Sequence, residues 1–290
     1  MSTPQLANTL VTANTVANAP SAPAPPPIPQ RSDEGWSIRT ASTTAGVGLL
    51  LMVPLSVIGK FVALDGLMTE GNAAKTAQDI LASEGLFRVG IASLILVIAL
   101  DVLVACALYR VFSPVNKSLS TVAAAMRLVY SAVFMVAVAQ LPGVLGLLTD
   151  DSNRAAFSAE QLNAQASMGL AAFSEIWYVG QFLFGVHLCV EGYLAYRSGY
   201  VPTVLGVLLA IAGLGYAADS LGATLSSGSW TPVSSFTFLG EFLLCLWLLI
   251  RARSIATNAA RLHGELTADR RRSRGFSTMK PWRGEASSSR

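Results

Sequence analysis

Six apolar runs follow one another along the chain and dominate its pattern. They cover residues 44–64, 89–111, 119–148, 173–195, 201–223 and 233–251. At ~1.5 Å of rise per residue, a helix made from each run crosses, or nearly crosses, the ~30 Å hydrocarbon layer of a bilayer. Because lipid offers no hydrogen-bond partners, the backbone N–H and C=O groups of such a run must hydrogen-bond to one another, as they do in a helix. The pattern therefore predicts an all-α, polytopic membrane protein built as a six-transmembrane-helix bundle.

Composition supports this prediction and excludes other classes of protein. Of the 290 residues, 52% are hydrophobic and 13% are charged, whereas soluble globular domains carry about 25% charged residues. This deficit of charge excludes an ordinary soluble enzyme and a disordered protein. The three cysteines lie in separate apolar runs without paired spacing, which excludes a disulfide scaffold.

The chain is predicted to divide into three parts. Residues 1–38 form a Pro/Ala-rich N-terminal tail that we expect to be disordered. This tail lacks the basic start and apolar stretch of a secretory signal. Residues 39–253 form the six-helix transmembrane domain, and residues 254–290 form a basic, mostly disordered C-terminal tail.

Lysine and arginine positions predict that both tails are cytoplasmic, since short cytoplasmic loops are enriched in these residues. With that orientation, ten basic residues close to the spans lie inside: Arg31, Arg39, Arg110, Lys117, Arg197, Arg251, Arg253, Arg261, Arg270 and Arg271. Four lie outside: Lys60, Lys75, Arg88 and Arg154.

Several short signals predict details within this frame. Asn72 can cap a short interfacial helix over residues 73–81, and a weaker helical signal surrounds residues 159–162 in the next outer loop. Pro142-Gly143 is expected to kink or shorten the third span. Gly206 and Gly213 are seven residues apart on one helix face, which favours a close helix contact.

Ionisable residues at membrane depth are the candidates for chemistry, because burying them in lipid is costly. The candidate intramembrane polar site consists of Asp101, Arg127, His187, Glu191 and Glu241. Asp101 and Arg127 lie at similar depths on consecutive helices and are natural partners, whereas His187 and Glu191 share one helix face. Asp219 lies nearer the outer end and is expected to reach the interface.

Three interpretations of this polar site remain open. It could be a structural cluster that locks the order of the helices, or the site of a small proton-linked carrier with His187 and Glu191 as the titrating pair. It could also hold the metal of a membrane hydrolase, with His187, Glu191 and Glu241 as weak candidate ligands. A single histidine is a poor donor set for zinc, so we predict neither a metal nor another cofactor, and no catalytic residues.

The C-terminal basic residues predict contact with the membrane surface. Arg251, Arg253, Arg270, Arg271, Arg272 and Arg274 follow the last span. Anionic lipid headgroups attract such a segment. The positive charge of the chain is concentrated in this tail and does not form a nucleic-acid-binding face. The partners predicted are therefore the bilayer and anionic lipids, without nucleic acid; protein partners are not predicted.

Separated motifs carry a resemblance to a known family. They are the stretch GNAAKTAQDILASEGLFR at residues 71–88, Leu108-Tyr109-Arg110, the stretch PVNKSL at 114–119, Met126-Arg127-Leu128, Gly206-Val207-Leu208-Leu209 and Gly213-Leu214-Gly215-Tyr216. In this order they resemble a bacterial multi-span membrane family, the domain of unknown function 4386, over about residues 40–250. The resemblance implies a helical bundle in the bacterial inner membrane and supplies no catalytic residues. We therefore expect a protein with a structural or accessory role and no enzymatic activity.

Overall fold

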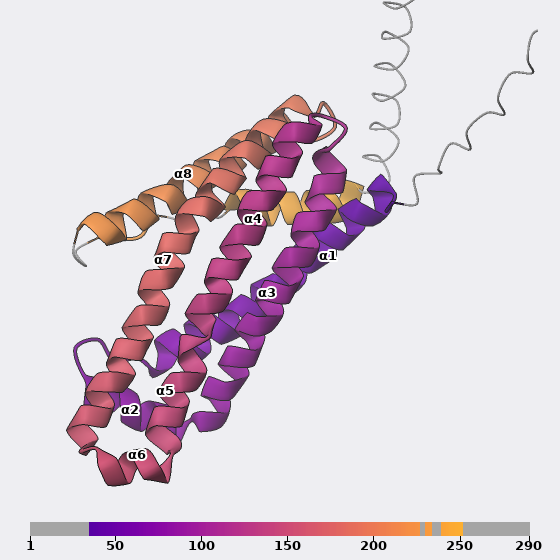
Figure 1. The fold of residues 1–290 in the computed structure, drawn as a ribbon. Helices are drawn as coiled ribbons and strands as arrows, with labels where there is room; N and C mark the ends of the chain where they lie inside the picture. Colours follow the sequence, from indigo (N-terminus) through magenta and orange to yellow (C-terminus); the bar gives the residue numbers. More distant parts are fainter. Residues whose placement is uncertain (1–34, 227–229, 234–238, 252–290) are drawn as a thin grey trace, which may run out of the picture. The chain divides into compact units, whose positions relative to one another are not determined.

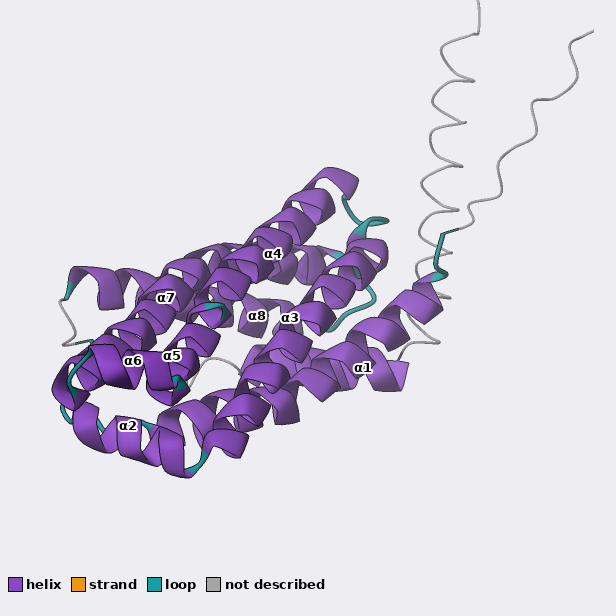
Figure 2. Ribbon diagram, turned by 60° about the horizontal axis from the view of Figure 1, so that its bottom comes forward, coloured by secondary structure: helices purple, strands orange, loops and turns teal. Residues whose placement is uncertain are grey.

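The computed structural model describes residues 35–226, 230–233 and 239–251 (Figure 1). The predictions for the two tails fall almost wholly outside these ranges. Within them, every regular element is a helix (Figure 2), which confirms the all-α fold class for this part of the chain.

Five helical segments are long and apolar enough to cross a membrane. They are α1 (Ile38–Ser56) with the π-helix η1 (Val57–Asp65), α3 (Glu84–Phe112), α4 (Lys117–Val138) with α5 (Gln140–Thr149), α7 (Ala159–Arg197) and α8 (Thr203–Leu225). The sixth predicted run is described at Val233 and over 239–251, and it is helical over 239–251. The chain is thus a multi-pass membrane protein by length and composition, and the count of six helices stays a prediction.

The fourth span begins earlier than its apolar run indicates. Residues 159–162 are not a separate outer helix; they form the first turn of α7, which continues to Arg197. The Ser158 side chain accepts from the Gln161 backbone N–H at 3.3 Å, and the Gln161 side chain accepts from the Ser158 N–H at 2.9 Å. This reciprocal capping box starts the helix. The polar residues after this capping box interrupt the apolar pattern of the sequence, but they do not interrupt the helix.

The proline in the third span has the predicted effect. The α4 helix ends at Val138, and α5 starts at Gln140 after a one-residue break. Pro142 has no N–H for the Val138 carbonyl four residues earlier, and its ring crowds that carbonyl, so the regular ladder breaks here. In the first span, Pro54 lies in the last turn of α1, three residues before the wider π-helix begins at Val57.

Two short helices lie beside the ends of α5 and α7 (Figures 1 and 2). The predicted interfacial helix is α2 (Ala73–Ala82), and Asn72 caps it by accepting from the Lys75 N–H at 2.9 Å. The second is α6 (Asp151–Ala156), capped by Asp150. Hydrogen bonds from the Ser152 hydroxyl and N–H hold the pKa of the exposed Asp150 carboxyl below its usual range.

The α7 and α8 helices pack through matched glycines, as the Gly206–Gly213 spacing predicts. A Cβ on Gly185 would lie 2.5 Å from the Gly213 carbonyl oxygen, and one on Gly192 would lie 2.6 Å from the Gly206 carbonyl oxygen. Both pairs bring backbone against backbone at a separation that no larger residue allows. This contact fixes the register of the two antiparallel helices and holds α7 between α8 and α4.

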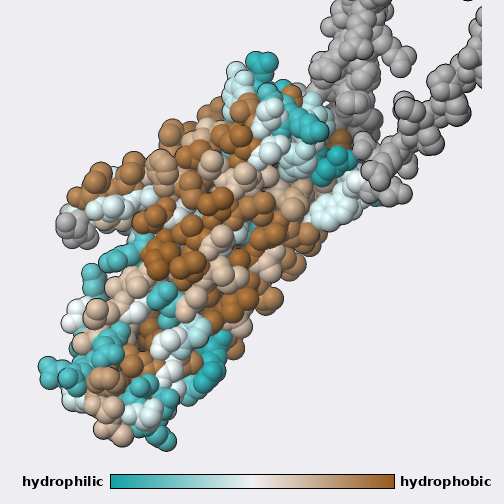
Figure 3. All heavy atoms as spheres, viewed as in Figure 1, coloured by the Kyte–Doolittle hydropathy of each residue, from teal (hydrophilic) through white to brown (hydrophobic). Residues whose placement is uncertain are grey.

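Charge separates the two ends of the bundle. The end with the α3–α4 and α7–α8 turns, here called the basic end, carries Arg39, Arg110, Lys117, Arg197 and Arg251, and its described stretches contain no Asp or Glu. The opposite end carries seven acidic residues, Asp65, Glu70, Asp79, Glu84, Asp150, Asp151 and Glu160, together with the basic residues Lys60, Lys75, Arg88 and Arg154. On the face in Figure 3, hydrophobic residues form a band between more hydrophilic ends. A membrane-embedded bundle would show this distribution.

The side chain of Asp219, which was expected to reach the interface, is buried within the protein. It accepts from the Trp230 indole N–H at 2.9 Å and from the Val233 backbone N–H at 2.7 Å. The carboxylate therefore anchors the segment that follows α8 by hydrogen bonds to side chain and backbone.

Candidate functional site

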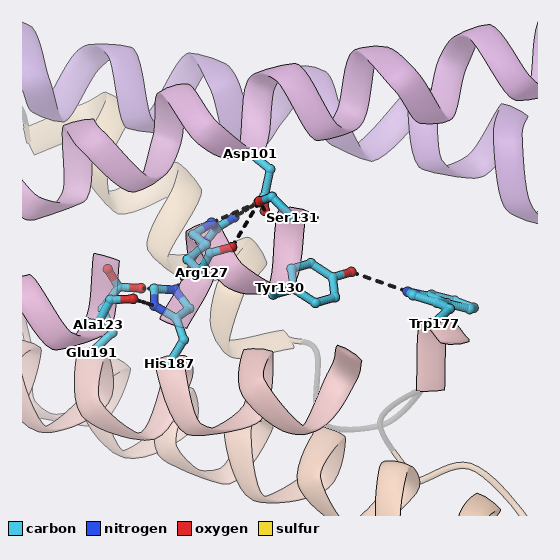
Figure 4. Close-up of polar contacts among 8 residues, drawn as sticks. All are labelled: Asp101, Ala123, Arg127, Tyr130, Ser131, Trp177, His187 and Glu191. Carbon is cyan, nitrogen blue, oxygen red and sulfur yellow. Dashed lines mark hydrogen bonds and ion pairs between the residues drawn. The ribbon is translucent and has the colours of Figure 1, made fainter. Parts of the chain in front are cut away.

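Three helices bring four of the predicted polar residues into one cluster. Asp101 comes from α3, Arg127 from α4, and His187 and Glu191 from α7, and each is at most 2% exposed. Figure 4 shows their side chains converging between these helices. We call these four residues, together with Ser131, the buried cluster.

Asp101 and Arg127 form an ion pair that Ser131 completes. Arg127 donates from Nε to Asp101 Oδ1 at 2.8 Å, and Ser131 donates from its hydroxyl to Asp101 Oδ2 at 2.5 Å. Both carboxylate oxygens thus have a partner, and the pairing predicted from depth is observed. The sequence pattern does not single out Ser131, because a serine is common in membrane helices, although it lies four residues after Arg127 on the same helix face.

The surroundings of His187 fix its tautomer. Its Nδ1 lies 2.9 Å from the Ala123 carbonyl oxygen, which can only accept, so Nδ1 carries a hydrogen. In a neutral imidazole, Nε2 must then be the acceptor. Arg127 Nη1 lies 3.2 Å from this nitrogen and is a suitable donor.

Nε2 of His187 also faces an acceptor. Glu191 Oε2 lies 3.2 Å from it, one helical turn away, and within the described residues no directed hydrogen bond reaches this oxygen. A nitrogen between a donor and an acceptor can satisfy only one of them. Neutral His187 accepts from Arg127, and protonated His187 donates to Glu191. The protonation state of the imidazole therefore decides which contact forms.

The fifth predicted residue lies near the cluster but outside its hydrogen bonds. Glu241, on the helix over 239–251, is within range of charge interaction with Arg127 and His187. Its side chain is a hydrogen-bond partner of Tyr216 on α8. The structure thus brings Asp101, Arg127, His187 and Glu191 into contact and leaves Glu241 as a neighbouring charge.

A narrow crevice lies beside the pair of His187 and Glu191. It is too tight to hold a water molecule. Its walls come from α3, α4 and α7, and its lining residues include Tyr109, Phe112 and Ser120.

Aromatic rings fill the bundle on the other side of the cluster. The Tyr130 and Phe184 ring centroids are 4.7 Å apart, and Phe184 contacts Tyr216 edge to face at 5.2 Å. Farther along, Trp177 donates its indole N–H to the Tyr130 hydroxyl at 3.3 Å (Figure 4). This packing separates the buried cluster from the end of the bundle opposite the basic end.

The weak metal candidates do not assemble into a centre. Among the residues that the structure describes, no three His, Cys, Asp or Glu side chains are placed to hold an ion together. The cationic Arg127 guanidinium also lies at the one free nitrogen of His187. Neither the donor set nor its charge fits a resident metal.

Of the predicted membrane-surface residues, only Arg251 is described. It is the last described residue of the helix over 239–251, and its guanidinium lies 5.4 Å from the centre of the Trp247 ring. Arg253, Arg270, Arg271, Arg272 and Arg274 lie outside the described residues, so the predicted contact with anionic lipid stays a prediction.

Comparison with known proteins supports the resemblance noted in the sequence. An uncharacterized protein of Archaeoglobus fulgidus is 34% identical over 166 residues, which are 57% of this chain and 85% of the relative. No solved structure matches the chain. The model of the family called domain of unknown function (DUF4386) matches residues 44–252. The chain is therefore a member of the DUF4386 family.

Proposed function

We propose that this protein is a small proton-linked carrier whose proton-binding pair is His187 and Glu191. The observation that carries the proposal is the position of His187 Nε2, 3.2 Å from both Arg127 Nη1 and Glu191 Oε2. Binding a proton at Nε2 ends its contact with Arg127 and creates one with Glu191. Because Arg127 belongs to α4 and Glu191 to α7, protonation is linked to the contact between two helices.

The balance of charge supports a proton-binding role. Asp101, Glu191 and Glu241 surround a single permanent cation, Arg127, in the described part of the bundle. Excess buried negative charge is unfavourable in a medium of low polarity. Protons on His187 or on a carboxyl group reduce this excess, and a cationic substrate would do the same.

A structural lock is a second candidate function, favoured by a different observation. Both oxygens of Asp101 are hydrogen-bonded, which makes the pairing of α3 with α4 complete without any ligand. We infer that the two roles are divided within the cluster. Asp101, Arg127 and Ser131 fix the helices, while His187 and Glu191 exchange the proton.

The proposed orientation places the basic end and both termini in the cytoplasm of a bacterial cell, with the protein in the inner membrane. Support comes from the clustering of Arg110, Lys117 and Arg197 in the turns at one end. The crevice beside Glu191 is lined by Phe112 and Ser120, which lie next to the α3–α4 turn at this same end.

Transport in proteoliposomes tests the proposal. A dye such as pyranine inside the vesicles reports internal pH while an amine, an organic acid, an amino acid or a sugar is added under an imposed pH gradient. We expect one class of compound to accelerate the collapse of the gradient with the wild type but not with Glu191→Gln.

Glu160→Gln is the matched control, because it removes a carboxylate from the exposed first turn of the same helix. It should behave as the wild type. If wild-type and Glu191→Gln vesicles respond identically to every class, the carrier proposal is wrong and the lock remains.

A further inference from the structure

A groove on the outside of the bundle lies apart from the buried cluster. It has a volume of about 290 Å³ and is lined by Trp36, Cys106, Tyr109, Arg110, Ala124 and Leu128. The α3 and α4 helices form its floor, and its lining is almost wholly apolar. Arg110 is among its lining residues.

The groove faces the apolar surroundings of the bundle. Leu128 is 38% exposed, and its neighbours Leu103 on α3 and Val129 on α4 are exposed to a similar or greater extent. In a membrane protein, such a surface is covered by acyl chains. An acyl chain is also the apolar group available in bulk to fill a lipid-facing hollow.

The arginine gives the groove its chemical preference. Arg110 donates from Nε and Nη2 to the Trp36 carbonyl oxygen at 3.2 and 3.0 Å, which holds the guanidinium beside Trp36, a residue that lines the groove. Within the described residues no carboxylate pairs with it, and the described stretches at this end contain no Asp or Glu. A guanidinium that keeps free N–H donors binds phosphate oxygens well.

Trp36 and Tyr109 complete a lipid-binding arrangement. Both line the groove beside Arg110, and aromatic side chains of this kind favour the headgroup level of a bilayer. A lipid with its phosphate on Arg110 would lie with its headgroup between these rings and one chain along Ala124 and Leu128.

We propose that this groove is a binding site for one anionic phospholipid, with the headgroup on Arg110 and an acyl chain between α3 and α4. The site is separate from the His187–Glu191 pair and does not depend on the proposed carrier function. It also differs from surface attraction to the C-terminal tail, because it requires the shape of the groove in addition to charge.

Native mass spectrometry of the full chain in detergent tests the charge requirement. The probes are phosphatidylglycerol and phosphatidylcholine with identical acyl chains, added in equal amounts. We expect the first bound lipid to be phosphatidylglycerol, and Arg110→Gln to lower this preference about fivefold, as the loss of one charge at a membrane surface implies.

Arg197→Gln is the matched control for charge. Arg197 lies at the same end and also follows a tyrosine, but it does not line the groove. It should leave the preference unchanged. An equal loss in both variants would overturn the proposal in favour of general attraction to the basic end, and a wild type without preference would overturn it as well.

A second pair of variants tests the shape requirement. Ala124→Trp fills the groove and keeps Arg110, whereas Ala125→Trp adds the same side chain at an exposed neighbouring position. Only Ala124→Trp should weaken binding of phosphatidylglycerol. If it binds as well as Ala125→Trp, the ligand is held by charge alone, as a free phosphate would be, and the groove is not the site.

Discussion

Glu191 Oε2 lies 3.2 Å from His187 Nε2, and the same nitrogen lies 3.2 Å from Arg127 Nη1. The two contacts compete, because one calls for a hydrogen on Nε2 and the other for a lone pair. Nδ1 is already committed to the Ala123 carbonyl. The cluster therefore has two alternative hydrogen-bond patterns that differ by one proton.

The first prediction concerns the tautomer of His187. The chain contains two histidines, so a His263→Ala variant carries only His187. In nitrogen NMR of ring-labelled protein at alkaline pH, we expect the proton on Nδ1, and acidification should add the second proton at Nε2. A proton on Nε2 alone at alkaline pH would contradict the assignment and remove the basis of the carrier proposal.

The second prediction concerns the ion pair of Asp101 and Arg127. Asp101→Leu leaves Arg127 buried without its closest carboxylate, which should destabilise the protein by about 3–5 kcal/mol. The double variant Asp101→Leu/Arg127→Met removes both charges and should recover most of this loss. Thermal unfolding in one detergent measures both effects. A double variant as unstable as the single one would mean that packing, and not the unpaired charge, causes the loss.

A third prediction tests the glycine contact between α7 and α8. Gly213→Ala places a Cβ 2.5 Å from the Gly185 carbonyl oxygen, so the helices must separate. We expect a loss of about 1–3 kcal/mol, as for overpacked cores. Gly146→Ala is the control, because a Cβ there meets nothing within 4 Å and alanine favours the helix. Equal melting temperatures for the two variants would show that the contact is loose.

The fourth prediction concerns alkaline pH and Tyr200, which lies in the turn between α7 and α8. Its buried hydroxyl donates to the Val111 carbonyl at 2.6 Å, and burial raises the pKa of Tyr200 above its usual value. The unfolded chain therefore releases this proton first. The protonated Tyr200 hydroxyl contributes its full share to the free energy of unfolding below the ordinary tyrosine pKa of about 10. This contribution falls as pH rises above that value.

Tyr200→Phe should lower the melting temperature at neutral pH, since the hydrogen bond is worth about 1 kcal/mol. It should also reduce the fall in stability between neutral pH and about pH 11. Tyr196→Phe, at a position 53% exposed in the same region, is the control. The prediction fails if both variants lose stability with pH as steeply as the wild type.

Much of the fold could be predicted from the sequence, because each relevant signal is local. Length and hydropathy locate five of the spans, Asn72 caps α2, and Pro142 interrupts the third span. The start of the fourth span was misplaced, since the capping box at Ser158 and Gln161 lies in polar sequence where an apolar pattern gives no signal.

The candidate site was predictable only in part. Charge in an apolar run reveals Asp101, Arg127, His187 and Glu191 one at a time, and depth along the helices indicates that they share a level. Ser131 and the Ala123 carbonyl carry no such signal, because serine and backbone groups occur throughout membrane helices. The groove at Arg110 was not predictable either, since it forms only where α3, α4 and the backbone of Trp36 come together in the folded chain.

The sequence by itself thus determined the class of protein, the boundaries of most spans and the set of buried charges, because the cost of placing polar groups in lipid acts on each segment separately. Only the tertiary structure decided which charges meet, which nitrogen of His187 is protonated, and that Glu241 stays outside the hydrogen-bonded cluster. These depend on how α3, α4 and α7 are rotated about their axes. That rotation is set by packing between helices, such as the glycine contacts of α7 with α8, and no single segment contains it.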